Sequence, residues 1–261
     1  MYKKYIIGLF TFCLVLASCK SDNESTNNFI PDRLDTVNVF ETIRGIYYSL
    51  PSPLEIATIA KKHSAAFDTE ILNPTKNSLN YTTSNAQAIN IGVYAADLAF
   101  ISLFDRKQYS ADIFSTLIRM AENIEILEGL NDTLITEIEQ NINDPDKVKN
   151  LIAEAFFKSD AFLKENNREF VATLIMTGAW VESYYIMCNM AMNSENSEDI
   201  NRLIVDQRLV LENILNALIS VKIDEQIINS LDELLGVINN CVTIEKVEVL
   251  DPYTEAVSYT H

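Results

Sequence analysis

Residues 168–192 read REFVATLIMTGAWVESYYIMCNMAM, and this stretch decides how the chain is predicted to fold. It is the most apolar helix of the sequence and is long enough to span a bilayer. Glu182, however, lies in the middle of it, with threonine, glycine and serine around it. A carboxylate at the centre of a membrane span is costly, whereas a helix that is apolar all round is typical of a bundle core. We therefore predict the central helix of a soluble bundle.

A second apolar helix begins after Ser84, where Ser84-Asn85-Ala86-Gln87 is a capping box, and continues as AINIGVYAADLAFISLF to residue 104. Four small residues on it allow a neighbouring helix to approach closely: Gly92, Ala95, Ala96 and Ala99. Gly92-Val93-Tyr94 with Asp97 is echoed by Gly178-Ala179-Trp180 with Glu182. The two acids are out of register by one position, so both chance and a duplication of two halves stay open.

The rest of the chain shows helical spacing of apolar residues, with only 6 Gly and 6 Pro in 261 residues. Asp144-Pro145 is a cap followed by proline at the first helical position. We predict an all-α fold: a bundle of about eight helices over residues 34–245, with a C-terminal tail at 246–261. The predicted helices outside the two apolar ones cover 34–50, a segment from Pro53, 110–128, 132–142, 145–163, 197–218 and 224–238, and a polar loop covers 68–83.

The N-terminal residues predict a targeting signal. Lys3 and Lys4 precede an apolar run over 5–16, which is too short for a membrane span, and Leu16-Ala17-Ser18-Cys19 resembles the bacterial lipobox. The resemblance implies that residues 1–18 are removed as a signal peptide and that Cys19 is lipidated. Residues 19–33 then form the lipidated cysteine and a flexible tether. An ordinary secretory signal and a poor transmembrane helix are the alternatives.

The residues after Cys19 predict the compartment. Lys20 stands where an inner-membrane retention signal has aspartate, which favours the outer membrane. The sequence Ser-Asp-Asn-Glu at 21–24 resembles surface-export signals of Bacteroidota lipoproteins, so both the periplasmic and the cell-surface face stay open. The membrane is thus a predicted partner through the lipid anchor.

The formal charge is -17, and loss of Lys3 and Lys4 makes the mature chain more negative still. Such a surface repels phosphate backbones and anionic headgroups, which excludes nucleic acid as a predicted partner. Cys188 and Cys241 remain in the mature chain beside Cys19; a disulfide between them and two separately buried thiols are both open.

One candidate polar pocket follows from the two apolar helices. Asn90, Tyr94 and Asp97 share one helical face, and Glu182 and Tyr185 share a face of the other helix. Buried carboxylates need a cation, a basic side chain or a proton. We therefore predict that Asp97 and Glu182 lie near each other, either as a site for a metal ion or small cation or as a structural network, with Arg119, Lys158 or Arg168 as partners.

No known metal or catalytic motif supports a specific chemistry. His63 and His261 are the only histidines and lack partners at ligand spacing, so no cofactor is predicted. Asp35-Thr36-Val37 and Asp132-Thr133-Leu134 resemble the O-glycosylation sequon of exported Bacteroidota proteins, which marks Thr36 and Thr133.

Four segments, YYSLPSPLE (47–55), AINIGVYAADLAF (88–100), KSDAFLKENNR (158–168) and GAWVESYYI (178–186), together resemble a family of uncharacterised all-helical lipoproteins of Bacteroidota. The resemblance implies an all-helical fold and a lipoprotein localisation, and it implies no activity, cofactor or catalytic residue.

Two classes of function follow. The first is a non-enzymatic binding or interaction module of the envelope, which holds a small ligand between helices or docks a protein partner. The second is a hydrolase-like enzyme that uses Asp97 and Glu182 as general acid and base. An open cleft lined by both acids would favour the enzyme, and a sealed polar network would favour the module.

Overall fold

The structure is a computed structural model that describes residues 69–104, 106–193 and 198–245, with the backbone alone for 241–245. All described residues belong to one compact unit, which falls within Val37–His261. The predicted signal peptide, Cys19, the tether, the helices before residue 69 and the tail over 246–261 lie outside the described residues.

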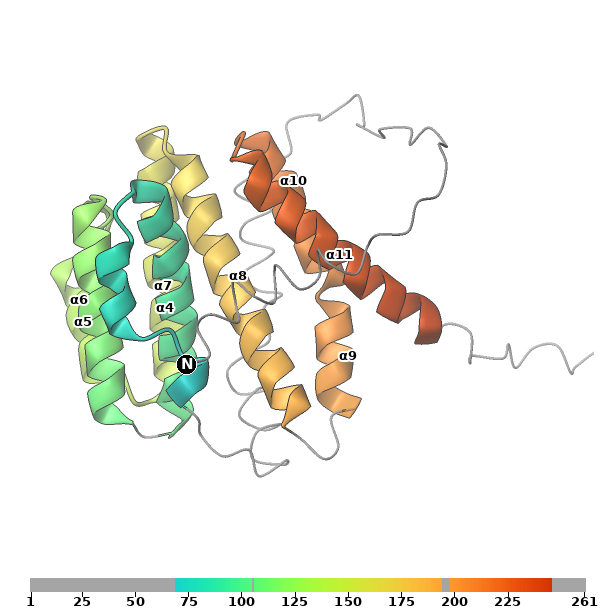
Figure 1. The fold of residues 1–261 in the computed structure, drawn as a ribbon. Helices are drawn as coiled ribbons and strands as arrows, with labels where there is room; N and C mark the ends of the chain where they lie inside the picture. The colour runs from blue at the N-terminus through green and yellow to red at the C-terminus, as the bar shows by residue number, and fades with distance from the viewer. Residues whose placement is uncertain (1–68, 105, 194–197, 246–261) are drawn as a thin grey trace, which may run out of the picture. The chain divides into compact units, whose positions relative to one another are not determined.

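The all-α prediction is confirmed for the described residues, which form eight α-helices and no strand (Figure 1). The α-helices are α4 (Ser84–Ile101), α5 (Lys107–Asn123), α6 (Asp132–Gln140), α7 (Pro145–Glu165), α8 (Glu169–Met192), α9 (Glu198–Asp206), α10 (Arg208–Ser220) and α11 (Glu225–Glu245). Four short 3-10 helices complete the described chain: η1 (Thr69–Ile71), η2 (Thr75–Asn80), η3 (Ser102–Phe104) and η4 (Leu127–Gly129).

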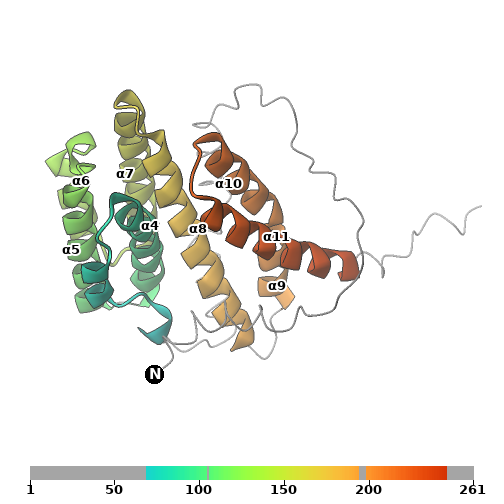
Figure 2. The same ribbon diagram turned by 45° about the horizontal axis from the view of Figure 1, so that its top comes forward.

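Helix α8 is the centre of the described bundle, as its composition predicts. It packs most extensively against α4 and also contacts α7, α9 and α10, while α5 packs on α4 and α11 packs on α10 (Figures 1 and 2). Trp180 and Tyr94, one from each central helix, are among the largest fully buried side chains. Burying such side chains is the main stabilising term of a bundle of this kind.

The contact between α4 and α8 depends on two glycines. A Cβ atom at Gly92 would lie 1.9 Å from the carbonyl oxygen of Ile175, and one at Gly178 would lie 1.9 Å from that of Ile89. Ile89 and Ile175 each precede one of these glycines by three residues, so the contact is reciprocal. The helices run in the same direction (Figure 1), and each backbone occupies the space that a side chain would fill on the other.

The N-cap of α4 lies one residue earlier than predicted. Thr83, not Ser84, is the N-cap: its backbone is extended and its hydroxyl accepts the N–H of Ala86 at 3.2 Å. The predicted return bond from the Gln87 side chain is absent, since its Oε1 is buried without a partner among the described residues. Two neighbouring hydroxyl residues compete for the cap here, and spacing alone does not decide between them.

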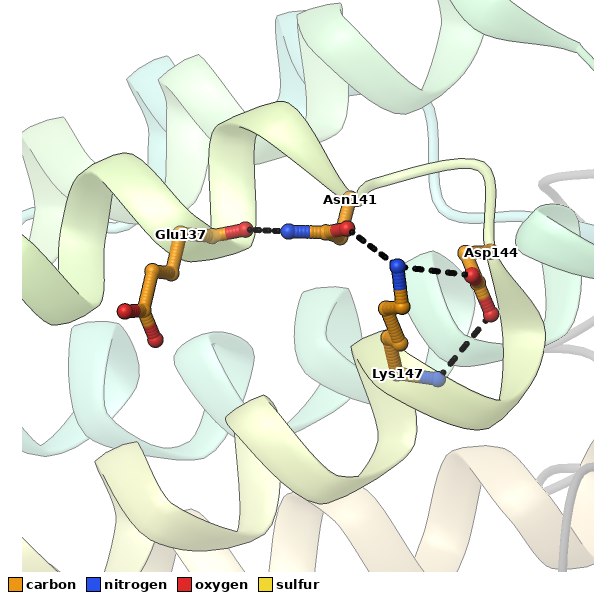
Figure 3. Close-up of polar contacts among 4 residues, drawn as sticks. All are labelled: Glu137, Asn141, Asp144 and Lys147. Carbon is orange, nitrogen blue, oxygen red and sulfur yellow. Dashed lines mark hydrogen bonds and ion pairs between the residues drawn. The ribbon is translucent and has the colours of Figure 1, made fainter.

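The predicted cap of α7 is confirmed (Figure 3). The Asp144 carboxylate accepts the backbone N–H of Lys147 at 3.2 Å, and Pro145 occupies the first helical turn. The Lys147 ammonium lies 3.5 Å from Asp144 and donates to the Asn141 side chain at 3.2 Å. Asn141 in turn donates to the Glu137 carbonyl at the end of α6, so this junction is closed by short-range bonds.

The prediction of a single helix over 197–218 is wrong in one respect, because the chain forms two helices, α9 and α10, which are separated at Gln207. The Gln207 side chain is buried and accepts the indole N–H of Trp180 at 3.0 Å. A buried indole N–H needs a partner, and this tertiary bond has no signal in the local sequence pattern.

By length and composition, α8 and the segment Ser84–Phe104 could each cross a membrane. Within the bundle, 72% of the apolar window of α8 and 56% of that of Ser84–Phe104 are buried. The central helices of a bundle meet the same criterion as membrane spans, because both environments favour apolar residues on every face.

Candidate functional site

The structure brings Asp97 and Glu182 together, as their spacing on α4 and α8 predicts. Asp97 has no exposed surface and Glu182 keeps 9%. The two carboxyl groups share a hydrogen bond at the contact between the helices. Such a bond needs a proton, since two ionised carboxylates can only accept.

The surroundings keep that proton in place. Burial, and then the charge of Glu182, raise the pKa of Asp97 well above its usual range. Burial raises the pKa of Glu182 to about 7. The Asp97 Oδ2 atom accepts the backbone N–H of Asn73 at 3.0 Å, and Asp97 Oδ1 has no donor among the described residues. The bond between the two acids raises the pKa of Asp97 and lowers that of Glu182, so Asp97 is the acid that donates the shared proton. At neutral pH the pair therefore holds at least one proton.

Asn73, in the segment between η1 and η2, is the hub of a polar network beside the pair. Its side-chain amide nitrogen donates to the Tyr81 hydroxyl at 3.1 Å and to the side-chain oxygen of Asn90 at 3.4 Å. Its own side-chain oxygen accepts from Asn77 at 2.7 Å. Asn90 thus joins the site through Asn73, and it also donates to the carbonyl of Ala86 at 2.8 Å.

The two predicted tyrosines take different positions. Tyr94 is fully buried and donates to the carbonyl of Pro74 at 3.1 Å, so it holds the same segment as Asn73 but does not bond either acid. Burial, followed by the nearby Tyr81 and Asp97, raises the pKa of its phenol. Tyr185 is half-buried, and no bond joins its hydroxyl to the network formed by the described residues.

The basic partners predicted for the acids bond elsewhere. Arg119 donates to the Ser78 hydroxyl at 2.8 Å, and Arg168 donates to the carbonyl of Ile124 at 2.8 Å. Lys158 pairs with Glu154 on its own helix at 3.1 Å. The proton therefore takes the place that the prediction assigned to a basic side chain.

This arrangement is a sealed network. No cluster of three or more His, Cys, Asp or Glu side chains that could hold a metal ion occurs among residues 69–104, 106–193 and 198–245. A metal ion usually needs more ligands than one carboxyl pair supplies. The pair is also too deeply buried to exchange protons with a substrate in a cleft, and a structural role fits its geometry.

A separate, apolar cavity of about 160 Å³ lies on the other flank of α4. Its walls come from α4, α5, α6, α7, α8 and the turn around η4, and neither Asp97 nor Glu182 lines it. Aliphatic, aromatic and alanine side chains form nearly all of the wall. The polar residues of the wall are Lys149, Ser159 and Ser183.

The cavity is partly open to solvent, and its apolar wall keeps surface that the bundle itself does not cover. Removing apolar surface from water contributes about 25 cal/mol per Å². A ligand that enters the cavity can therefore gain free energy by covering this wall.

Sequence reasoning missed Asn73 and the cavity. Asn73 lies in a stretch predicted only as a polar loop, and nothing in its spacing indicates a bond to α4. Ala95 and Ala99 were predicted to let another helix approach, but they line the cavity and remain half-exposed there. The close approach itself uses Gly92 and Gly178.

The other predicted positions are separate from this site. Thr133 is exposed in the first turn of α6, and its glycosylation stays a prediction, while Thr36 and Cys19 lie outside the described residues. Cys188 carries a free thiol whose pKa is raised by burial. The side chain of Cys241 lies outside the described residues.

Comparisons of this chain with protein-family models, with curated proteins and with solved structures found no match of any kind.

Proposed function

We propose that this chain is a lipid-anchored protein of the bacterial outer membrane, and that its helical bundle is a non-enzymatic binding module for a small molecule. The apolar cavity lined by α4, α5, α6, α7, α8 and the turn around η4 is the observation that carries the binding role. The anchor rests on Lys3, Lys4 and the sequence Leu16-Ala17-Ser18-Cys19. The resemblance to uncharacterised helical lipoproteins of Bacteroidota agrees with that address.

The cavity supports ligand binding because of where it lies. Five helices and the turn around η4 surround it, and it is partly open to solvent, so a small molecule could enter without unfolding the bundle. Ligand sites in helical bundles are commonly found between helices in this way. A ligand in this space would remove apolar wall surface from water and make contacts with the wall.

The buried acids support the non-enzymatic role over the hydrolase. General acid–base catalysis needs both groups within reach of a substrate. Asp97 is fully buried, its Oδ2 accepts the backbone N–H of Asn73, and the cavity wall contains neither acid. A substrate in the cavity would therefore not meet them.

The binding role is tested by what the protein carries from its native host. We would purify the mature chain, with Cys19→Ser to remove acylation, and analyse an organic-solvent extract by gas chromatography and mass spectrometry. Ala155→Leu places a larger side chain in the cavity wall, while Ala161→Leu adds the same volume at an exposed position of the same helix. We expect a near-stoichiometric compound with the wild type and Ala161→Leu, and none with Ala155→Leu. An empty extract, or equal recovery from all three proteins, contradicts the proposal.

The anchor has its own test. In cells fed an alkyne-labelled fatty acid, the wild-type chain should incorporate the label and fractionate with the outer membrane. Cys19→Ser should abolish the label, while Cys13→Ser, whose cysteine lies in the predicted signal peptide, should keep it. Label that persists in Cys19→Ser would overturn the lipoprotein assignment.

A further inference from the structure

The volume of the cavity limits the size of its ligand. At about 160 Å³ it is close to the 150 Å³ of an engineered apolar cavity that binds benzene. It is well below the roughly 300–1,000 Å³ of sites for drug-sized molecules. A single six-membered ring, or an alkyl chain of similar volume, therefore fits, and a nucleotide, a disaccharide or a fused-ring system does not.

The wall excludes a charged ligand. Phe100, Phe114 and Phe156 bring aromatic rings to it, and most of the remaining wall is aliphatic. The Ser183 hydroxyl already donates to the carbonyl of Ala179 at 2.8 Å. A charge placed among these groups would lose its hydration with little compensation.

Lys149 is the charged residue of the wall, and it is half-exposed. A lysine in this position can cover apolar surface with its methylene stem while its ammonium stays in water. Lys149 therefore does not require an anionic ligand, and a comparison of neutral with anionic probes tests this point.

On the basis of the binding role proposed above, we propose that the cavity binds a neutral, compact, apolar molecule the size of one aromatic ring. The methyl groups of Ala95, Ala99 and Ala155 are the surfaces such a ligand covers. All three keep accessible area although they lie in the cavity wall. Binding gains from covering this area and from contacts with the phenylalanine rings.

The test uses toluene, benzoate and naphthalene as probes, with binding to the mature Cys19→Ser chain followed by NMR of isotope-labelled methyl groups. We expect saturable binding of toluene, and at least tenfold weaker binding of benzoate, which adds a charge to the same ring. Naphthalene, which adds a second ring, should also bind at least tenfold more weakly. Lys149→Gln should change toluene affinity by less than twofold. Benzoate binding tighter than toluene, or a tenfold loss in Lys149→Gln, would overturn the neutral-ligand inference.

Two cavity variants locate the binding. Ala155→Leu and Ala99→Leu, on different helices, should each weaken toluene binding at least tenfold, and Ala161→Leu should leave it unchanged. Circular dichroism checks that each variant is folded, and one folded cavity variant is sufficient for the test. Unchanged toluene affinity in a folded cavity variant places the probe elsewhere and overturns the inference.

The outcomes also separate this inference from the binding role. A charged or multi-ring host compound that Ala155→Leu excludes would refute the ligand class and leave the binding role intact. Failure of toluene to bind, together with an empty host extract, would refute both.

Discussion

Helix α4 meets its surroundings differently on its two flanks. On one flank Asp97 bonds to Glu182, and Asp97, Asn90 and Tyr94 bond to the segment around Asn73, so a shared proton supplies the donor that the pair of acids needs. On the other flank Ala95 and Ala99 leave space. The comparison teaches that buried polar groups mark structure here, whereas the apolar space marks the candidate ligand site.

Between the two flanks lies the glycine contact, and disrupting it should have the largest effect. Gly178→Ala places a Cβ against the carbonyl of Ile89, so α4 and α8 must separate. We expect a loss of about 3 kcal/mol or more in the free energy of unfolding, measured by urea titration. Gly236→Ala is the matched control, because a Cβ there meets nothing within 4 Å. It should stabilise the chain by about 0.5–1 kcal/mol through helix propensity. A neutral Gly178→Ala would contradict the close approach.

The polar flank predicts an unusual dependence of stability on pH. The pKa of Glu182 rises from 4.5 to about 7 on folding, and that of Asp97 also rises. The folded chain then binds more protons than the unfolded chain above about pH 4, so stability falls as the pH rises. For Glu182 the fall between pH 4.5 and 8 is about 3 kcal/mol.

Glu182→Gln should remove most of that fall while keeping a hydrogen bond to Asp97. Asp160, whose pKa burial raises to about 6, contributes to the same range in every variant. The comparison is therefore between slopes, measured by urea unfolding at several pH values. Glu122→Gln, at an exposed position of α5, should retain the wild-type slope. Equal slopes in the wild type and Glu182→Gln would show that Glu182 takes up no proton on folding, and would leave the raised pKa of Asp97 as the source of the slope.

A smaller effect separates the two roles of Asn73. Asn73→Ala keeps the backbone N–H that binds Asp97 but removes the side-chain bonds to Tyr81 and Asn90. We expect a loss of about 1–2 kcal/mol in unfolding free energy, with the pH dependence of the acid pair preserved. A flattened pH dependence would mean that the side chain, rather than the backbone, supports the pair.

The cavity flank predicts a modest gain of stability. Ala155→Leu fills part of the empty volume and should stabilise the ligand-free chain by about 1 kcal/mol. Thermal unfolding measures this change, with Ala161→Leu, which should be nearly neutral, as its control. Destabilisation by Ala155→Leu, in a chain freed of any ligand, would mean that the space is too narrow to hold an added isobutyl group.

Particular elements show how far sequence reasoning reaches. The α7 cap at Asp144-Pro145 was predictable, because a capping carboxylate and a proline act within one turn. The proximity of Asp97 and Glu182 was predictable from chemistry, since two buried acids on apolar helices are stable only with a partner. The partner of these acids was not predictable, because a sequence does not show which carboxyl group holds a proton. It does show basic residues, and the prediction therefore named Arg119, Lys158 and Arg168.

By itself, the sequence determined the helices and the two apolar ones that form the centre of the bundle, and lipidation at Cys19 stays a prediction from the sequence. These features depend on periodicity and on motifs a few residues long, and such signals lie entirely in residues that are neighbours in the sequence. The tertiary structure alone decided three features: the reciprocal approach at Gly92 and Gly178, the break at Gln207 beneath Trp180, and the cavity beside Ala95 and Ala99. Each depends on which surfaces of distant segments meet, and a small side chain permits either close contact or empty space until its neighbour is in place.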